Sequence, residues 1–271
     1  MPNKEIVQQV ITKEDIVNSL KRLGVTSNMI LEVHAKLSSF EYVLGGARTV
    51  VDALLELVGD GGTIVMPLHF KDNAEPSNMS NPSISADLWE TVRQEMPANN
   101  PVLSDLESGN EIVDEFRKRD DVIFSTHPNF AYVAWGKYAK LLCNRQSTHF
   151  PLADESPVAR LYELKGNVLL MGCGFEECTC MHLAEYHSEA RPIVIKGASS
   201  LNKNGEREWK KYLDLELDSN VFVKVGEIMR KNGMIQEMDL NSCHIQLFSA
   251  TTAIDETSKY FDKTIVYDLY R

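Results

Sequence analysis

The chain of 271 residues is long enough for one large α/β domain, and its 43% hydrophobic and 25% charged composition is that of a folded globular protein. The formal net charge of -11 argues against duplex nucleic acid and anionic membranes as partners, because both recruit basic surfaces. The same charge would attract a cationic small molecule, although an acidic balance also serves solubility alone.

The sequence also bears on the compartment of the protein. No apolar run approaches the roughly 20 residues needed to span a bilayer, and the polar stretch from Met1 to Val10 lacks the core of a signal peptide. Five cysteines are an odd number for a disulfide framework. We therefore expect a cytoplasmic protein with free thiols and no membrane association.

The N-terminal part of the chain predicts a parallel βαβ unit. Its expected elements are a helix capped by Thr12 and stopped at Gly24, a strand over 29–33, a helix entered through Gly45-Gly46 and ended by Gly59, and a strand over 63–66. The order strand, loop, helix, strand is typical of two parallel strands joined by a crossover helix.

The rest of the chain mixes helical and strand patterns around a polar stretch from Lys71 to Ser85, which we expect to be a long loop. Helices are expected over 86–96, 109–119, 179–189, 221–231 and 251–261, and strands over 122–125, 131–135, 167–171, 192–195 and 208–213. Asn202-Lys-Asn-Gly205 is a hairpin turn signal. The prediction is a single domain over 1–271, a three-layer α/β/α sandwich with a mixed central sheet and added β-hairpins.

The segment from Glu176 to Glu185 carries the largest set of chemically useful side chains, directly after a predicted strand and a glycine-rich turn. Open α/β sheets bind ligands at this end of their strands. In a helix that begins at Thr179, the side chains of Thr179, His182 and Glu185 share one face. His182 beside a carboxylate suits a general base, and Thr179 could donate to an oxyanion. The alternative is an amphipathic helix with a surface His-Glu pair, because His-x-x-Glu alone is a weak signal.

Cysteines in the same region raise the question of a metal. Cys173, Cys178, Cys180 and His182 are all potential zinc ligands. There is no C-x-x-C pair, however, and residues 178 and 180 could bind one ion only from an irregular loop. We expect no metal and buried or incidental thiols, with a nucleophilic cysteine as the remaining alternative.

A second candidate binding segment follows the first predicted strand and consists of His34, Ala35, Lys36, Leu37, Ser38 and Ser39. Hydroxyl and backbone N–H groups ahead of a helix N-terminus suit a phosphate or a pantetheine chain. Lys36 and Arg48 would add positive charge there. The glycine spacing of a Walker or dinucleotide-binding loop is missing, which disfavours nucleotide hydrolysis and NAD binding. The alternative is an ordinary βα loop.

Two further segments have structural and functional interpretations. His127-Pro128 lies between two predicted strands and is typical of a structural turn. In Asp154-Glu155-Ser156-Pro157, the Ser-Pro step can start a helix, and the carboxylates before it could cap that helix or bind a polyamine.

Taken in chain order, these motifs resemble the aminoglycoside N3-acetyltransferase family across nearly the whole sequence. The segments that carry the resemblance are His34-Ala-Lys-Leu-Ser-Ser39, Gly45-Gly46, Gly62-Thr-Ile-Val-Met-Pro67, His127-Pro128, Ala134-Trp-Gly136, Glu155-Ser-Pro157, Thr179-Cys-Met-His-Leu-Ala-Glu185 and Asn204-Gly-Glu-Arg-Glu-Trp-Lys210. Each motif is weak, but their order and spacing together are specific. One departure stands out, because Ala35-Lys36 replaces the two serines that the family typically has at this point.

The resemblance implies an α/β/α fold distinct from the GNAT acetyltransferases. It also implies acetyl transfer from acetyl-CoA to the 3-amino group of an aminoglycoside. Residues 34–39 would then line the pantetheine chain of CoA, and His182 would be the base, oriented by Glu185. Asp154, Glu155 and Glu177 are candidates to hold the other ammonium groups of the acceptor, by charge and position.

The expected partners are therefore CoA and a cationic amine, with self-association into a homo-oligomer left open. Two alternatives stay open as well. One is an N-acetyltransferase for another amine metabolite or biosynthetic intermediate. The other is a catalytically impaired protein that binds CoA or an aminoglycoside. The reason to consider it is Lys36, which departs from the family sequence. On the loop expected at CoA, Lys36 could contact the phosphates as a point charge.

Overall fold

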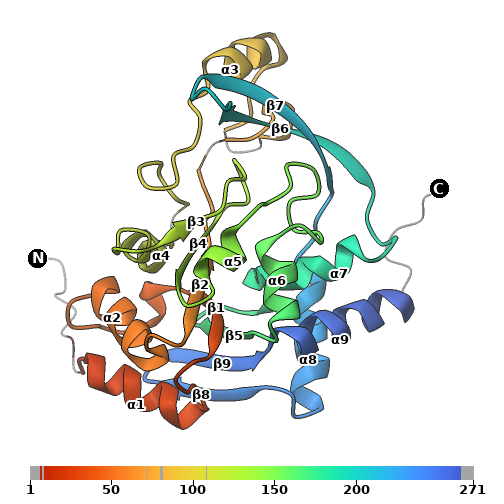
Figure 1. Cartoon of the computed structure of the whole chain (residues 1–271). Helices are drawn as coiled ribbons and strands as arrows, with labels where there is room; N and C mark the ends of the chain where they lie inside the picture. Colours follow the sequence, from red (N-terminus) through yellow and green to blue (C-terminus); the bar gives the residue numbers. More distant parts are fainter. Residues whose placement is uncertain (1–6, 8, 72, 80–81, 108, 264–271) are drawn as a thin grey trace, which may run out of the picture.

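The computed structural model describes residues 7, 9–71, 73–79, 82–107 and 109–263, and at its centre is a seven-stranded sheet (Figure 1). The strands are β1 (Ile30–Ala35), β2 (Thr63–Pro67), β3 (Ile123–Phe124), β4 (Tyr132–Gly136), β5 (Asn167–Met171), β8 (Gln236–Leu240) and β9 (Cys243–Ser249). Their order across the sheet is β3-β4-β2-β1-β5-β9-β8. The central strand β1 runs parallel to β2 and β5, and the outer pairs are antiparallel. The predicted mixed sheet is confirmed.

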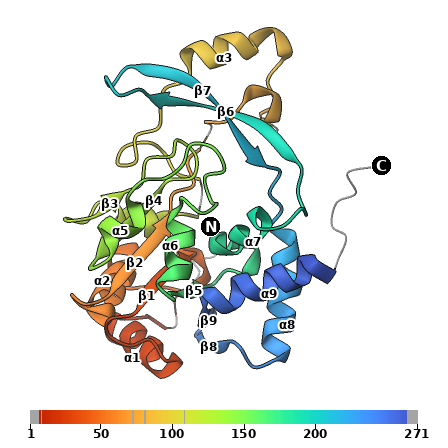
Figure 2. The ribbon, with the colours of Figure 1, turned by 45° about the vertical axis from the view of Figure 1, so that its right-hand side comes forward.

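Helices cover both faces of this sheet and complete the predicted three-layer sandwich (Figures 1 and 2). One layer holds α1 (Lys13–Leu23), α2 (Ala47–Val58) and α4 (Glu111–Phe116). The other holds α5 (Ala139–Cys143), α6 (Pro157–Glu163), α7 (Leu183–Tyr186), α8 (Asn220–Lys231) and α9 (Ala250–Lys263). Within the described residues, no helix is long and apolar enough to cross a membrane.

Side chains of β1 alternate between the two faces of the sheet, and this alternation decides which helical layer its polar residues face. Leu31 and Val33 belong to the core beneath α1, α2 and α4, whereas Ile30 belongs to the core of the opposite layer. Successive side chains of a strand point to opposite faces. Glu32 and His34 therefore share the face of Ile30 and point toward the layer of α5 to α9.

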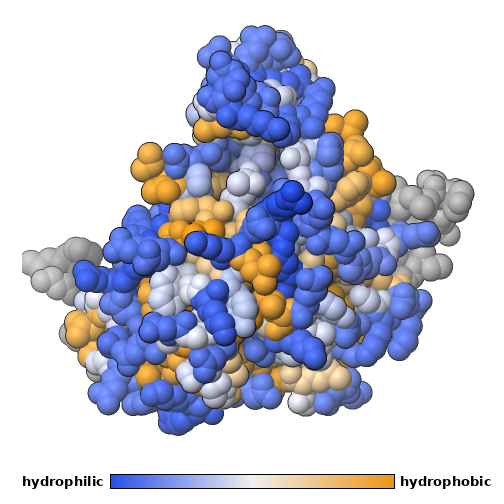
Figure 3. Space-filling view, in the orientation of Figure 1, coloured by the Kyte–Doolittle hydropathy of each residue, from blue (hydrophilic) through white to orange (hydrophobic). Residues whose placement is uncertain are grey.

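A hairpin of β6 (Ile193–Leu201) and β7 (Arg207–Leu215) forms a separate two-stranded sheet, and α3 (Trp89–Glu95) lies beside it (Figures 1 and 2). The turn signal at 202–205 is confirmed, since the Asn202 backbone N–H donates to the Glu206 carbonyl at 2.8 Å. Arg207 ties the hairpin to the end of α3 by donating to the Arg93 carbonyl at 3.0 Å. Apolar side chains of the hairpin, including Ile193 and Ile195, are exposed, and Figure 3 shows apolar surface on this flank.

Several elements differ from the sequence prediction. The strands β8 and β9 and the short helix α5 were not predicted. For β8 the reason is that it is a mostly exposed edge strand of polar residues. The helix expected over 86–96 divides into a 3-10 turn (Ala86–Leu88) and α3. The helix expected over 109–119 shortens to α4.

The hairpin is also fastened by one buried amide, which allows a test of the fold. Asn73 donates through Nδ2 to the Ser199 carbonyl at 2.9 Å and accepts from the Ser199 backbone N–H at 2.8 Å. Both residues are buried. Asn73→Ala would leave two buried backbone groups without partners, so we expect the free energy of unfolding to fall by about 1–3 kcal/mol in chemical denaturation. Asn204→Ala, in the exposed hairpin turn, should change it by no more than about 0.5 kcal/mol. Equal stability of the two variants would contradict this role.

Candidate active site

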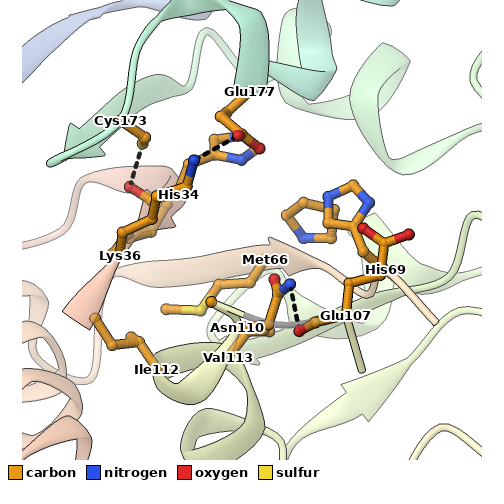
Figure 4. Close-up of a pocket in the computed structure, with 14 residues that line it drawn as sticks. His34, Lys36, Met66, His69, Glu107, Asn110, Ile112, Val113, Cys173 and Glu177 are labelled. Atoms are coloured by element: carbon orange, nitrogen blue, oxygen red, sulfur yellow. Dashed lines mark hydrogen bonds and ion pairs between the residues drawn. The ribbon is translucent and has the colours of Figure 1, made fainter. Parts of the chain in front are cut away.

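A pocket of about 160 Å³ lies where the parallel strands β1 and β2 end, beside the residues that follow β5 (Figure 4). Its polar lining consists of His34, Lys36, His69, Glu107, Asn110, Cys173 and Glu177. The carboxyl ends of parallel strands are the usual ligand-binding edge of an open α/β sheet. The sheet therefore places this pocket at the edge where a ligand is expected.

The segment 34–39 reaches this pocket with its first half only. His34, Ala35 and Lys36 line the pocket that the described residues outline, whereas Leu37, Ser38 and Ser39 form a 3-10 turn (Leu37–Ser39) outside that lining. The Ser39 hydroxyl donates to the Lys36 carbonyl at 2.7 Å. The expected binding segment is thus partly a structural turn in this structure.

Gly172 explains how the turn fits against the end of β5. Its φ of +69° lies in the left-handed region, and a Cβ there would stand 1.8 Å from Ser39 Oγ. Glycine avoids both the strain and the overlap. The Lys36 backbone N–H donates to the Met171 carbonyl at 3.0 Å, so that the turn continues the pairing of β1 with β5.

Lys36 and Glu177 form an ion pair across the mouth of the pocket, with Nζ and Oε1 2.7 Å apart (Figure 4). The hydrogen bond with Glu177 is the main cause that raises the pKa of Lys36. Burial works against the charged form of Glu177, but the hydrogen bond and charge of Lys36 outweigh it and lower the pKa of that carboxyl. The ammonium that we expected at CoA phosphates is therefore engaged by a carboxylate.

His182 lies against Glu185, and Arg191 holds the far side of the same carboxylate. His182 Nδ1 contacts Glu185 Oε2, and Arg191 Nε donates to Oε1 at 2.5 Å. Oε1 also accepts from the Asp218 backbone N–H at 3.2 Å, and Glu185 is fully buried. The His182 ring packs edge-on against Phe222, with centroids 4.8 Å apart. The arrangement fixes the orientation of the imidazole and leaves Nε2 without a hydrogen bond to the described residues.

The backbone that carries this pair differs from the helix expected over 179–189. Residues Thr179–His182 form a 3-10 turn, and only Leu183–Tyr186 is α-helical. Cys178, Cys180 and Met181 are all fully buried, and an α-helix would spread their side chains around its axis. The Thr179 hydroxyl contacts the Glu177 carbonyl at 3.5 Å rather than facing along a helix with His182.

His69 is a pocket residue that was not predicted from the sequence. Burial, followed by the nearby charge of His34, lowers the pKa of His69 to about 4, so its imidazole is neutral at pH 7. Glu177 and His182 are smaller electrostatic influences on the same pKa. Its position could have indicated a pocket residue, because it lies two residues after Pro67, the last residue of β2, at the ligand-binding edge of the sheet.

Glu32 forms a buried cluster with the two cysteines. Its Oε1 accepts from the Tyr132 hydroxyl at 3.3 Å and its Oε2 from the Cys180 backbone N–H at 3.3 Å. The sulfur atoms of Cys178 and Cys180 are 3.7 Å apart, and the three residues together offer metal-ligand atoms within 4.8 Å of one another. Burial raises the pKa of both thiols. Glu32 was not predicted from the sequence, because it lies within an otherwise apolar strand.

The other candidate carboxylates lie elsewhere. Asp154 is 82% exposed and accepts from His187 Nε2 at 2.7 Å, and Glu155 is exposed. Neither lines the pocket that holds Glu177. The cap of α6 is Ser156, whose Oγ accepts from the Ala159 backbone N–H at 3.2 Å. The interpretation of the carboxylates as the cap was therefore wrong, although the Ser-Pro helix start is confirmed.

His127 is a structural turn residue, as its sequence context indicated. Its Nδ1 accepts from the backbone N–H groups of Asn129 and Phe130 at 3.1 and 3.0 Å. Its Nε2 lies 3.2 Å from the Thr148 carbonyl. Burial lowers the pKa of this imidazole to about 4, so the neutral ring can donate to that carbonyl and accept from the turn.

Comparison with known proteins gives a consistent result. The family model described as aminoglycoside 3-N-acetyltransferase matches residues 33–262. The SPbeta prophage-derived aminoglycoside N(3')-acetyltransferase-like protein YokD of Bacillus subtilis is 36% identical over 262 residues, which are 95% of this chain and 96% of YokD. The crystal structure of YokD superposes with a TM-score of 0.88 over 93% of this chain and 99% of that one.

Two further relatives extend the comparison. Aminoglycoside N(3)-acetyltransferase VIII of Streptomyces fradiae is 31% identical over 227 residues, or 82% of this chain and 78% of that protein. The structure described as AAC-IIIb binary with CoASH shares the fold with a TM-score of 0.83 at 21% identity, over 94% of this chain and 97% of that one. The family model and the level of identity agree, and the chain is an acyltransferase that belongs to the aminoglycoside 3-N-acetyltransferase family.

Proposed function

We propose that the protein transfers the acetyl group of acetyl-CoA to the 3-amino group of an aminoglycoside, on its 2-deoxystreptamine ring, with His182 as the general base. The observation that carries this proposal is the buried chain of contacts from Arg191 through Glu185 to His182. The family supports acetyl transfer to aminoglycosides, and a relative of the same fold was crystallised with CoASH.

A base is needed because of the chemistry of the acceptor. An alkylammonium has a pKa of roughly 9–10 and is mostly protonated at pH 7, when it cannot attack a thioester. We assign removal of that proton to Nε2 of His182, since Nδ1 is turned to Glu185. The carboxylate then stabilises the imidazolium that forms, and Arg191 keeps the carboxylate in place.

The bonds follow from direct attack. After the ammonium proton has passed through His182 to solvent, the free amine adds to the thioester carbonyl and the C–N bond forms. His182 then takes the second proton from that nitrogen and passes it to the CoA thiolate as the C–S bond breaks. Thr179 is the proposed donor to the oxyanion, where one such donor is worth on the order of 3 kcal/mol. Residues 34–39 would line the pantetheine chain, through the part of the segment that faces the pocket. No covalent enzyme intermediate is needed.

Other aspects of the function follow from the same set of residues. We place the enzyme in the cytoplasm as a single domain over 1–271, where its five free cysteines would stay reduced. Glu177 is the proposed carboxylate for a second ammonium of the acceptor, with Asp154 and Glu155 as outer candidates. The intact His182–Glu185 contact favours an active enzyme over a catalytically impaired binding protein.

The base assignment predicts a large effect of one substitution. His182→Ala should lower kcat by about a hundredfold or more, because general base catalysis typically contributes about 10² to 10⁴. Release of free CoA thiol from acetyl-CoA with a 2-deoxystreptamine aminoglycoside would report the rate, and titration calorimetry should show nearly unchanged CoA affinity. His244→Ala, an exposed histidine on β9 paired with Asp239, should retain normal turnover. A loss of less than about fivefold in His182→Ala would remove His182 as the base.

We further propose that the reaction needs no metal, although Glu32, Cys178 and Cys180 have ligand atoms within reach of one ion. The Glu32 oxygens already accept hydrogen bonds, and burial keeps both thiols protonated, whereas zinc binds the thiolate. Elemental analysis of protein purified without chelators should find well below one metal per chain. Stoichiometric zinc that survives dialysis would overturn this proposal.

A further inference from the structure

The Lys36–Glu177 pair places a cation of the protein at the carboxylate proposed to hold an acceptor ammonium. Lys36 follows β1, and Glu177 ends the 3-10 turn after β5 (Phe175–Glu177), so the pair joins two sides of the pocket (Figure 4). Nζ and Oε1 are 2.7 Å apart, and the side chains are 42% and 38% exposed. The pair thus stands where solvent and a ligand can reach it.

The pair changes what the pocket offers to a charged ligand. Without Lys36, Glu177 would present a carboxylate to an incoming ammonium. With Lys36 in contact, that charge is already neutralised, and a second ammonium would meet a like charge at short range. The surrounding titratable groups are His34, His69, Glu107, Cys173 and Glu176, of which all but Glu176 line the pocket. His69 is neutral at pH 7, so it adds no attraction for a cation.

We infer that the Lys36–Glu177 pair determines acceptor specificity, with the Lys36 ammonium occupying the position that a second ammonium of the acceptor would otherwise take. The site then selects an amino sugar or aminocyclitol with few ammonium groups near the reacting amine, over a polycationic aminoglycoside. This inference rests on the proposed function, because it concerns the acceptor of the same reaction. Lys36 is here a specificity-determining residue and takes no part in proton transfer.

The test compares two acceptors in one ratio. The kcat/KM for neomycin, a polycation, is divided by the kcat/KM for free 2-deoxystreptamine, at saturating acetyl-CoA. Any effect of a variant on CoA binding or on the chemical step acts on both acceptors and cancels in the ratio. Lys36→Met removes the charge while keeping side-chain length, and Glu177→Gln removes the opposite charge with little change in shape.

The expected ratios follow from the charge left at the pair. Lys36→Met leaves Glu177 negative, so the ratio should rise about tenfold over the wild type. Glu177→Gln leaves Lys36 positive, so the ratio should fall several-fold. The double variant leaves neither charge and should return close to the wild-type ratio. Added salt should shrink these differences, because both side chains are partly exposed and are screened by ions.

A matched control is available on the surface. Lys13 and Glu56 form an ion pair with the same 2.7 Å separation and with exposures of 50% and 53%, and neither lines the pocket. Lys13→Met removes one positive charge from the protein without touching the site, so its ratio should equal that of the wild type. A rise in this control as large as in Lys36→Met would assign the effect to net charge and overturn the inference.

Two outcomes separate this inference from the proposed function. If the wild type turns over both acceptors but Lys36→Met changes their ratio by less than about twofold, the inference fails and the proposed function stands. If the wild type acetylates neither acceptor, the proposed function fails, and calorimetric titration of the two amines into the same variants still tests the pair. In that titration, the ratio of affinities should rise in Lys36→Met and fall in Glu177→Gln, and unchanged ratios would overturn the inference.

Discussion

The candidate site depends on one fully buried carboxylate, that of Glu185. Burying a charge costs desolvation free energy unless the charge is paired and hydrogen-bonded. When one partner is removed, the charge stays buried and that desolvation cost is no longer offset. Both oxygens of Glu185 are engaged, by His182 on one side and by Arg191 and the Asp218 backbone on the other. These partners come from the 3-10 turn that precedes α7, the approach to β6 and the approach to α8. Satisfying one carboxylate therefore brings three segments of the chain together around the imidazole.

The sequence predicted those parts of the molecule that depend on local patterns. The buried strands β1, β2 and β5, the hairpin turn at 202–205 and the capped helix α1 each follow from residues that are neighbours in the chain. The contact between His182 and Glu185 was predicted for the same reason, since the two residues are three positions apart. It formed even though the backbone there begins as a 3-10 turn rather than the expected α-helix.

What the sequence did not predict depends on contacts between distant segments. Arg191 and His69 contribute to the site through the packing of the layers, and no local pattern distinguishes them from other polar residues. Glu32 was hidden in an apolar strand, and its partners Tyr132 and Cys180 come from other elements. Lys36 was recognised as a departure from the family, but its partner Glu177 lies 141 positions away in the chain. The edge strand β8 was missed because pairing with β9, rather than its own polar residues, stabilises it.

The segment that carries α3 leaves the pocket after His69 and returns to it at Glu107, and its two ends are hydrogen-bonded to each other. The Glu107 backbone N–H donates to the His69 carbonyl at 2.9 Å, and the Lys71 N–H donates to the Asp105 carbonyl at 3.1 Å. These two hydrogen bonds fix the ends of the segment, so the positions of His69 and Glu107 do not depend on how many residues lie between them. Because the entropy of loop closure grows only slowly with loop length, this segment can gain or lose residues at little cost to the pocket. A change of length between Lys71 and Asp105 would therefore leave His69 and Glu107 in place.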